Sequence, residues 1–477
     1  MSKKSPSPPT LLSSSTYFKP FVLLVLVFSA ALVSAAVFAY YPFSLSTSWV
    51  DPPVRFGDPA TPGVSVQLHD DETAADVDVA SPGVLTRTGR SAFVWDDYSE
   101  DPFANGRLTA NGGTWSWNPV GYIEVSATSL SSSWGGACVA YYSANPPPGT
   151  SLIYVLTKEL HATRANDQYS GLIMAESDSE FYLMGYSHAP RRGIRIRKYS
   201  GDSWATLASA SLNLAENTWF NFLGVRETAG GLSFTVYDNA GAQQGDSIST
   251  TDPTVTVNLV GVGIYTNNRQ LTACFDDFVA CADANPSLVN VTGLKEGWTV
   301  YLYDGSGALV KQATAGPDGK VSLEVLTKPI IRNGRLEIKQ GNVVILPSQS
   351  FSEVVGGDVY ECSVKDINIL SFRNEDSKAY SVYLRVKSIQ VPAGYSGSIN
   401  LWVGPAETTP IQIVGSSVLV DTTSEITLNP VETSRVHGIF SPSLTPSSQI
   451  VLTLSFHYYI PSSKVEVEYP VKVTVHR

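Results

Sequence analysis

Between residues 90 and 284 the chain carries a series of short runs in which apolar and polar positions alternate. The runs are Gly121–Ser126, Ser151–Leu156, Gly171–Ala175, Phe181–Tyr186, Gly193–Lys198, Trp219–Arg226, Leu232–Tyr237 and Leu259–Tyr265. Stretches rich in Gly, Asn and Asp, which favour turns, separate them, and we find no convincing amphipathic helix pattern. Alternation with a period of two residues is typical of strands. Many short strands joined by turns predict a β-sandwich or jelly roll.

Two further segments carry the same signal. In residues 285–364, Trp298–Tyr303 reads as a strand that ends in a Gly-rich turn, and Val321–Val325 reads as another. In residues 365–477 the alternating runs are Tyr380–Ile389, Ser398–Val403, Ile411–Val414, Gln449–Phe456 and Lys464–Val475. We therefore expect an all-β chain in which one large sandwich is followed by two smaller, Ig-like sandwiches.

The N-terminal part of the chain carries one long apolar run in place of alternating apolar and polar residues. Residues 21–40 contain no charged side chain, and a helix of about 20 apolar residues spans a bilayer. Lys3, Lys4 and Lys19 precede this run, which predicts a cytoplasmic tail over residues 1–20 and an external location for the rest. The rival interpretation is a cleaved signal peptide and a secreted protein. Residues 41–89 are rich in Pro and carry two short alternating runs, so we expect a β-stalk or linker, or strands added to a neighbouring domain.

The amino-acid composition argues against one class of binding partner. Charged residues make up only 16% of the 477 residues, and the net charge is -11. Proteins that bind nucleic acids carry basic patches, so this balance argues against a nucleic-acid partner. It fits instead a solvated exterior that faces the medium. The layout of an anchor followed by β modules resembles that of surface proteins of hyperthermophilic archaea.

Residues 90–284 contain several short motifs: Trp95-Asp96-Asp97-Tyr98 and Gly113-Thr114-Trp115 near the start, Asp178–Leu183 in the middle, and Phe275–Val279 at the end. In their order and spacing these motifs resemble the concanavalin A-like lectin/glucanase superfamily in its laminin-G-like branch. Residues 285–364 resemble small Ig-like modules related to carboxypeptidase-regulatory domains. Together these resemblances imply a lectin-like sandwich followed by spacer modules.

The resemblance also implies a structural calcium ion. Family members often hold Ca²⁺ between the first and last strands, which places Asp97 and Asp277 as ligands here. Ca²⁺ requires six to eight oxygen ligands, most of them carboxylate and carbonyl oxygens. The alternative is that these acids cap turns or are solvated.

The same superfamily includes glycosidases, so catalytic acids must be considered. Laminarinase-type enzymes carry three acids on one strand, and Glu176, Asp178 and Glu180 match that spacing. Here Ser177 and Ser179 separate the acids, and Ser-Asp-Ser favours a turn. We therefore expect a hairpin turn between Gly171–Glu176 and Glu180–Tyr186, and a protein that is not an enzyme.

Aromatic and basic residues supply the binding candidates. Trp134 and Trp204 lie among Ser and Gly, where loops could present their rings to a sugar. Arg195 and Arg197 alternate with two isoleucines, which places both arginines on one face of a strand. That face is either solvated or binds an acidic glycan or an anionic neighbour.

Four cysteines, Cys138, Cys274, Cys281 and Cys362, could form disulfides outside the cytoplasm. Cys281 with Cys362 and Cys138 with Cys274 is one of three possible pairings, and free buried thiols are the alternative. Asn290 begins an Asn-Val-Thr acceptor for N-glycosylation.

These observations favour a non-catalytic cell-surface protein for glycan binding, adhesion or envelope assembly, whose partners are glycans or envelope proteins. A laminarinase-type hydrolase that uses the three acids is one alternative. A structural subunit of a surface filament or layer is the other.

Overall fold

The computed structural model describes residues 64–68, 76–78, 84–127, 134–161, 168–187, 192–266, 270–364, 366–374, 377–405, 408–441, 449–459, 461 and 466–476. Every regular element in these ranges is a β-strand, so the all-β prediction is confirmed. The predicted tail at residues 1–20 and the predicted transmembrane helix at residues 21–40 lie outside the described residues. Within the described part, no helix has the length and apolar character needed to span a membrane.

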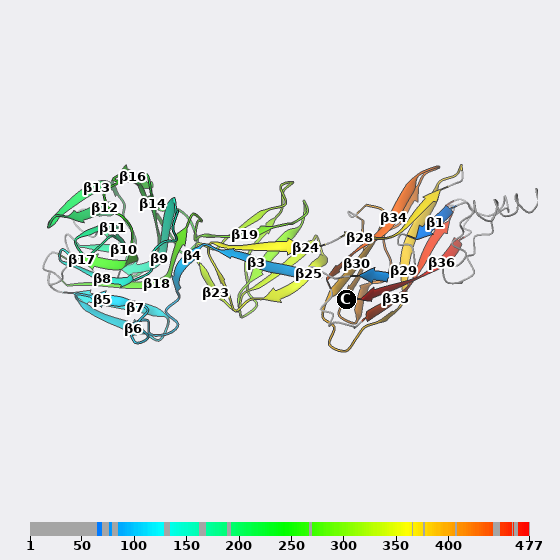
Figure 1. Ribbon diagram of the computed structural model, residues 1–477, viewed down its shortest axis with the longest axis horizontal. Coiled ribbons are helices and arrows are strands. Elements are labelled where there is room, and N and C mark those ends of the chain that lie inside the picture. The colour runs from blue at the N-terminus through cyan, green and yellow to red at the C-terminus, as the bar shows by residue number, and fades with distance from the viewer. Residues whose placement is uncertain are drawn as a thin grey trace, which may run out of the picture.

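The strands form three sandwich-like units that follow one another along the long axis of the molecule (Figure 1). The large unit packs a seven-stranded sheet against an eight-stranded sheet. In order, the seven strands are β13 (Ser203–Ser211), β12 (Gly193–Ser200), β11 (Glu180–Ser187), β10 (Tyr169–Ala175), β17 (Leu259–Tyr265), β8 (Ala137–Tyr142) and β5 (Thr109–Asn111). The eight are β16 (Ile248–Thr251), β15 (Gly231–Tyr237), β14 (Trp219–Glu227), β9 (Leu152–His161), β18 (Leu271–Ala282), β7 (Tyr122–Ala127) and β6 (Thr114–Asn118), with β4 (Ala92–Asp96) paired to β18.

The middle unit contains two four-stranded sheets and a short two-stranded ribbon. One sheet is β22 (Val321–Glu324), β19 (Leu288–Thr292), β27 (Asp358–Ser363) and β3 (Val84–Arg90). The other is β21 (Leu309–Thr314), β20 (Thr299–Tyr303), β24 (Arg335–Gln340) and β25 (Val343–Ser350). The ribbon pairs β23 (Ile330–Arg332) with β26 (Glu353–Val355).

The third unit contains a six-stranded and a five-stranded sheet. The first is β1 (Val64–Leu68), β28 (Asp366–Asn374), β34 (Thr433–Ser441), β30 (Ser398–Val403), β31 (Ile411–Val414) and β32 (Ser417–Val420). The second is β2 (Asp76–Asp78), β36 (Glu466–His476), β35 (Gln449–Tyr459), β29 (Tyr380–Gln390) and β33 (Ile426–Leu428).

The three units are nested in the sequence. The chain contributes β1 and β2 to the third unit and β3 to the middle unit before it enters the large unit at β4. It leaves the large unit after β18, completes the middle unit and then completes the third. The large unit therefore projects from the middle unit as an insertion, and two chain crossings join them.

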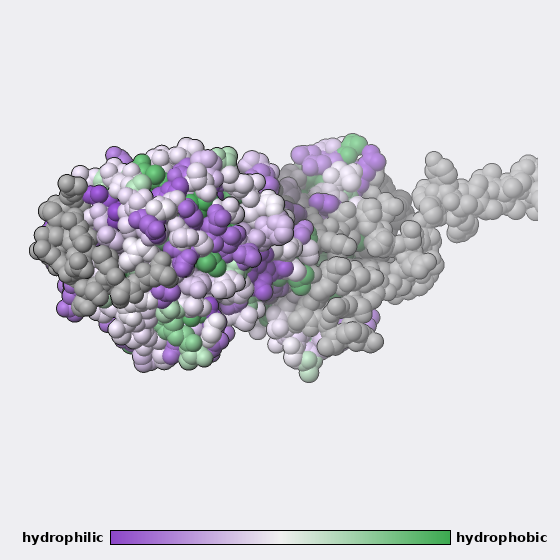
Figure 2. Space-filling view, turned by 60° about the vertical axis from the view of Figure 1, so that its left-hand side comes forward, coloured by the Kyte–Doolittle hydropathy of each residue, from purple (hydrophilic) through white to green (hydrophobic). Residues whose placement is uncertain are grey.

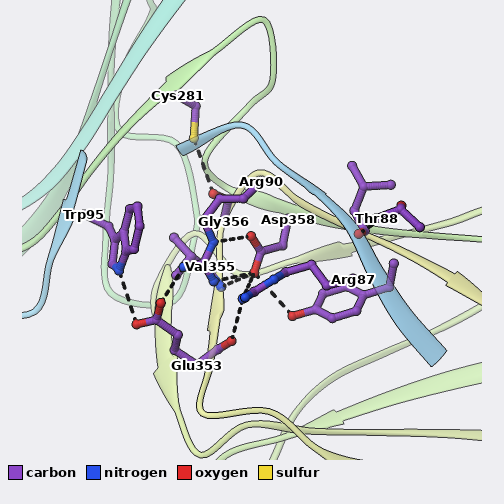
Figure 3. Close-up of polar contacts among 11 residues, drawn as sticks. Arg87, Thr88, Arg90, Trp95, Cys281, Glu353, Val355, Gly356 and Asp358 are labelled. Atoms are coloured by element: carbon purple, nitrogen blue, oxygen red, sulfur yellow. Dashed lines mark hydrogen bonds and ion pairs between the residues drawn. The ribbon is translucent and has the colours of Figure 1, made fainter. Parts of the chain in front are cut away.

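A buried polar network joins the large and middle units (Figure 3). The Arg90 guanidinium donates to both carboxylate oxygens of Asp358, at 2.7 and 3.0 Å, and also to Glu353. The Trp95 indole N–H donates to Glu353 at 3.2 Å, and the Arg90 guanidinium lies 4.5 Å from the centre of the Trp95 ring. The Cys281 thiol donates to the carbonyl of Gly356. Arg90, Glu353 and Asp358 all belong to the middle unit, so the contacts that cross the junction are those of Trp95 with Glu353 and Arg90 and that of Cys281 with Gly356.

Apolar contacts strengthen both junctions. Val279 of β18 packs with Ile330 and Val355 of the middle unit, so the outer face of the eight-stranded sheet is covered there. At the other end, Trp402 and Ile439 of the third unit lie in the core of the middle unit. The seven-stranded sheet is the layer of the large unit on the side away from these junctions (Figure 1).

The described surface of the large unit is mostly hydrophilic, with small and separated apolar patches (Figure 2). The large apolar side chains exposed across the described residues are scattered: Val84, Val120, Leu309, Leu419 and Val431.

Candidate functional site

The outward side of the seven-stranded sheet, which we call the distal face, differs from an ordinary solvated sheet face. Strand side chains alternate between faces, and on β10 Leu172 and Met174 enter the core between the sheets. Tyr169 and Ile173 point the other way, into a second apolar cluster on the distal face. The sheet therefore carries apolar side chains on both of its sides.

Aromatic rings from several strands build this second cluster. Trp204 of β13 lies 5.3 Å from Phe181, 5.3 Å from Tyr199 and 5.0 Å from Tyr265 between ring centres. Its indole N–H donates to the carbonyl of Gly135 at 2.9 Å. Trp204 and Tyr265 are only partly buried, so they form the accessible part of the aromatic cluster. Partly exposed rings with a fixed orientation are the groups on which sugar rings stack.

A row of glycines crosses the sheet beside these rings. Gly263, Gly171 and Gly185 are cross-strand neighbours on β17, β10 and β11, and the next residue in the row is Arg195 of β12. A Cβ atom on Gly185 would lie 2.0 Å from the carbonyl oxygen of Ser170, so no larger residue fits there. The row leaves a strip of sheet without side chains, which gives long side chains from β12 room to lie flat.

Arg197 uses this room. Its guanidinium carbon lies 4.5 Å from the Tyr169 ring centre, 4.5 Å from that of Trp204 and 5.0 Å from that of Tyr265. The Nε and Nη1 atoms are buried and have no hydrogen-bond partner among the residues that the structure describes. Burial lowers the pKa of this guanidinium, and the nearby Tyr169 and Tyr265 partly counteract that effect. The prediction that Arg195 and Arg197 share one face is therefore confirmed, whereas the expectation of a simply solvated face is wrong.

Arg195 connects the aromatic cluster to a surface depression of about 710 Å³. Its guanidinium lies 5.5 Å from the Tyr169 ring, and its Nε atom is also buried without a partner. The depression is lined by Arg192, Gly193, Arg195, Ser209, Ser211 and Asn213, among others. The site thus combines stacking surfaces with guanidinium, hydroxyl and amide groups that can contact the polar substituents of a sugar.

Trp134 and Trp204, the two predicted binding residues, come together in this cluster. The Trp134 ring lies 5.1 Å from Phe181 and is only 2% exposed, so the expectation of an exposed ring is wrong for it. Phe181 and Tyr141 enclose the ring from both sides. Trp204 belongs to strand β13 rather than to a loop, but it keeps an accessible ring. Sequence reasoning missed the contribution of Tyr265, which no local motif marks.

The three acids of the hydrolase alternative lie in a turn, as the Ser-Asp-Ser pattern predicts. The backbone N–H groups of Glu176 and Ser177 both donate to the carbonyl of Glu180 and so close the hairpin between β10 and β11. Asp178 is exposed at the tip. Glu176 accepts from the backbone of Thr256 at 3.0 Å. Hydrolysis with retention needs two carboxyl groups that face each other across the bound sugar, and this turn provides no such cleft.

The two predicted calcium ligands are paired with cations of the protein. The Arg332 guanidinium donates to both oxygens of Asp97 at 2.6 and 2.9 Å, and the Lys158 ammonium pairs with Asp277. Burial would raise the pKa of Asp97, but Arg332 lowers it to about 2. Burial and the nearby Asp277 raise the pKa of Asp276 to about 7.

These contacts do not fit a calcium site, because Lys158 and Arg332 already bind the oxygens that the ion would need. Among the described residues, no group of three or more His, Cys, Asp or Glu side chains is arranged to hold a metal ion. Calcium therefore stays a prediction from the resemblance. A rise in melting temperature on adding calcium would support it.

The cysteines differ from the expected disulfides, because all four are free buried thiols. Cys138 faces the core between the two sheets. On β18, Ala273 and Phe275 face the same core, so Cys274, which lies between these two residues in the sequence, points to the opposite side of the strand. Its thiol contacts Glu124 instead. Cys281 and Cys362 belong to two different apolar clusters. In this structure the pairs Cys138 with Cys274 and Cys281 with Cys362 are not formed, because the partners lie on different faces or in different cores, which agrees with the alternative of free buried thiols.

Asn290, the predicted glycosylation site, lies in the middle of strand β19. Its side-chain carbonyl accepts a hydrogen bond from Ser322 at 2.7 Å. Glycosylation at this residue stays a prediction.

Comparisons with known proteins give partial matches only. No family model matches the chain, and no curated protein sequence matches it. A solved structure of the GH43 BlXynB protein from Bacillus licheniformis matches with 15% identity and a TM-score of 0.31, over 39% of each chain. The carbohydrate binding module CBM66 from Bacillus subtilis matches with 13% identity and a TM-score of 0.28, over 37% of this chain and 96% of that one. The cellulose induced protein Cip1 matches with 14% identity and a TM-score of 0.28, over 39% of this chain and 96% of that one.

This chain therefore spans about two fifths of the length of the BlXynB chain. In each of these matches the likeness covers about two fifths of this chain, and the function proposed for this protein rests on its own residues.

Proposed function

We propose that this protein is a non-catalytic surface protein that binds glycans through the distal face of a concanavalin A-like sandwich. The observation that carries the proposal is the convergence of the partly exposed Trp204 and Tyr265 rings with arginine N–H groups that lack a partner among the described residues, beside a depression of about 710 Å³. Stacking surfaces next to convergent polar groups are the usual chemistry of a ligand site.

The position of the distal face within the molecule supports the same function. The outer face of the eight-stranded sheet is covered by the middle unit through Val279, Ile330 and Val355. The distal face belongs to the opposite layer and is directed away from that junction (Figure 1). A binding face at the end of a row of units can reach a partner that the described parts of the middle and third units do not obstruct.

In this proposal residues 21–40 hold the chain at the membrane, and residues 41–477 lie outside the cell. The middle and third units act as spacers that carry the large unit. Protease treatment of intact cells tests this location, because external residues should be digested before lysis. Resistance until lysis would contradict it.

Binding is tested with the full chain on an array of immobilised glycans. We expect wild type to bind, and Trp204→Ala and Tyr265→Ala to reduce binding at least tenfold, because each removes a ring face on which sugar stacks. Trp219→Ala is the matched control, since this partly buried tryptophan lies on the eight-stranded sheet, 6.0 Å from Tyr122. Equal loss of binding in all three variants, or unchanged binding in the first two, would contradict the proposed site.

A further inference from the structure

Arg195 and Arg197 also indicate which glycans the distal face selects. We propose that the site recognises acidic glycans, and that the two guanidinium groups bind the carboxylate or sulfate group of one sugar unit. This inference rests on the proposed glycan binding and adds the charge of the ligand to it.

The first argument is the number of guanidinium donors at this site that lack acceptors. Among the described residues, the Nε atom of Arg195 and the Nε and Nη1 atoms of Arg197 are buried without a partner, whereas Arg226 and Arg335 each leave only a buried Nε atom without one. Arg90 is paired with Asp358 and Glu353. Arg226, which is 5% exposed, donates to two backbone carbonyls. Burying a cation without a counter-ion is costly, because the group loses its hydration. The contacts of Arg195 and Arg197 with the Tyr169 ring offset only part of that cost. Unpartnered buried N–H groups on Arg195 and Arg197 therefore indicate a ligand that supplies the missing acceptors.

The second argument is the geometry of the two guanidinium groups. Both lie against the ring of Tyr169, at 5.5 Å for Arg195 and 4.5 Å for Arg197. They are therefore close enough to repel each other, and this repulsion contributes to the lowered pKa of Arg197. An anion between them would remove the repulsion. Because the guanidinium is planar and carries its donors in a fork, it binds carboxylate and sulfate oxygens in pairs.

The third argument is the arrangement of the surrounding groups. The Ser209 and Ser211 hydroxyls and the Asn213 amide line the depression next to Arg195. Trp204 and Tyr265 lie on the other side of Arg197. A sugar whose acidic group contacts the arginines would thus have a ring platform on one side and hydroxyl partners on the other. A simple inorganic anion would leave both sets of groups unused.

The fourth argument is the charge of the whole chain. The net charge is -11, so the surface as a whole repels polyanions. Two unpaired cations on such a protein give specific local attraction rather than general adhesion to acidic polymers.

The test uses the full chain and two matched pairs of soluble polymers. Polygalacturonate is compared with its methyl ester, which has the same backbone without the charge, and dextran sulfate is compared with dextran. We expect at least tenfold tighter binding to an acidic polymer than to its neutral counterpart. Preference for polygalacturonate would assign a carboxylate ligand, and preference for dextran sulfate would assign a sulfate.

Variants of the arginines connect the preference to the site. We expect Arg197→Met and Arg195→Met to lose the preference, since methionine retains an unbranched apolar chain and removes the guanidinium. Arg197→Lys should recover part of it, because the charge returns without the planar fork. Arg385→Met is the control, since this arginine is exposed on the third unit and pairs only with Asp421 there. Melting curves identify any variant that fails to fold. If a methionine variant does not fold, the preference of Arg197→Lys for acidic over neutral polymers decides between the outcomes.

The outcomes separate this inference from the function on which it rests. Equal binding to the acidic and neutral polymers, with loss of both in Trp204→Ala, would leave glycan binding standing and overturn the acidic preference. Wild-type preference in the arginine variants would also overturn it. If no acidic or neutral glycan binds, the inference and the proposed function both fail.

Discussion

Single residues inside the large unit influence how its stability depends on pH. Glu159 of β9 is fully buried between the sheets. Burial raises the pKa of its carboxyl group well above the usual range, and a hydrogen bond with Ser170 offsets this only in part. The carboxyl group is therefore neutral in the folded protein at pH values where it is ionised in the unfolded chain.

This difference gives a prediction for Glu159→Gln. A raised folded-state pKa contributes stability below the unfolded pKa of about 4.3, and that contribution is lost as pH rises through the folded value. Relative to the variant, wild type should therefore lose roughly 1–3 kcal/mol of unfolding free energy between acidic and mildly alkaline pH. Urea unfolding across that range measures it.

The matched control is Glu296→Gln, since Glu296 is exposed in a turn of the middle unit. The free energy of unfolding of Glu296→Gln should depend on pH in the same way as that of wild type. Parallel curves for wild type and Glu159→Gln would contradict the assignment of a neutral buried carboxyl group.

At the scale of strands and sheets, the glycine row determines what the distal face can hold. Gly185 pairs with Gly171 in register, and neither strand has room for a side chain at this position. The row therefore leaves a strip without side chains next to Arg195, on the face that also carries Arg197.

Gly185→Ala should destabilise the protein by about 1–3 kcal/mol, because the new Cβ would force apart two paired strands. Gly89→Ala is the control, since a Cβ there would make only an ordinary contact with Val359 at 3.9 Å. Thermal unfolding of both variants measures the difference. Equal melting temperatures would show that the strands adjust without cost.

At the scale of the whole molecule, the junction around Arg90 couples the large unit to the middle unit. The Asp358 side chain is fully buried, and Arg90 is its main cation. Removal of one partner of a buried ion pair leaves the other charged and unsatisfied, which costs about 3–5 kcal/mol. We therefore expect Arg90→Met to lower the stability of the middle unit, which contains both members of this pair. The variant also loses the contact of Arg90 with Trp95, so we expect the weakened junction to separate the unfolding of the two units into two calorimetric transitions.

Arg87→Met provides the matched control. Arg87 lies 3.7 Å from the same carboxylate, but its side chain is 37% exposed. Its removal should change stability by less than about 1 kcal/mol, as for other exposed pairs. If Arg90→Met unfolds in a single calorimetric transition with the wild-type melting temperature, the apolar contacts alone join the units.

Local sequence pattern determined most of the secondary structure of this protein. Alternation predicts strands wherever one face is buried, because side chains on a strand point to opposite sides. For the same reason the hairpin with Ser177 and Ser179 at its turn, and the common face of Arg195 and Arg197, followed from a few neighbouring residues. These features depend only on the backbone geometry of neighbouring residues, so the local order of residue types is enough to predict them.

Only the tertiary structure decided which strands meet and what they cover. Strand β1 pairs with β28 and β3 with β27, although hundreds of positions separate them along the chain, and no local signal marks these partners. Nor does any local signal show that the four cysteines are free thiols, because whether two cysteines can pair depends on the faces that distant strands present. The rings around Arg197 come from β10, β13 and β17, so an arginine that looks solvated in the sequence becomes part of a half-buried aromatic site. Long-range contacts of this kind depend on the packing of the complete chain rather than on the preferences of any short segment.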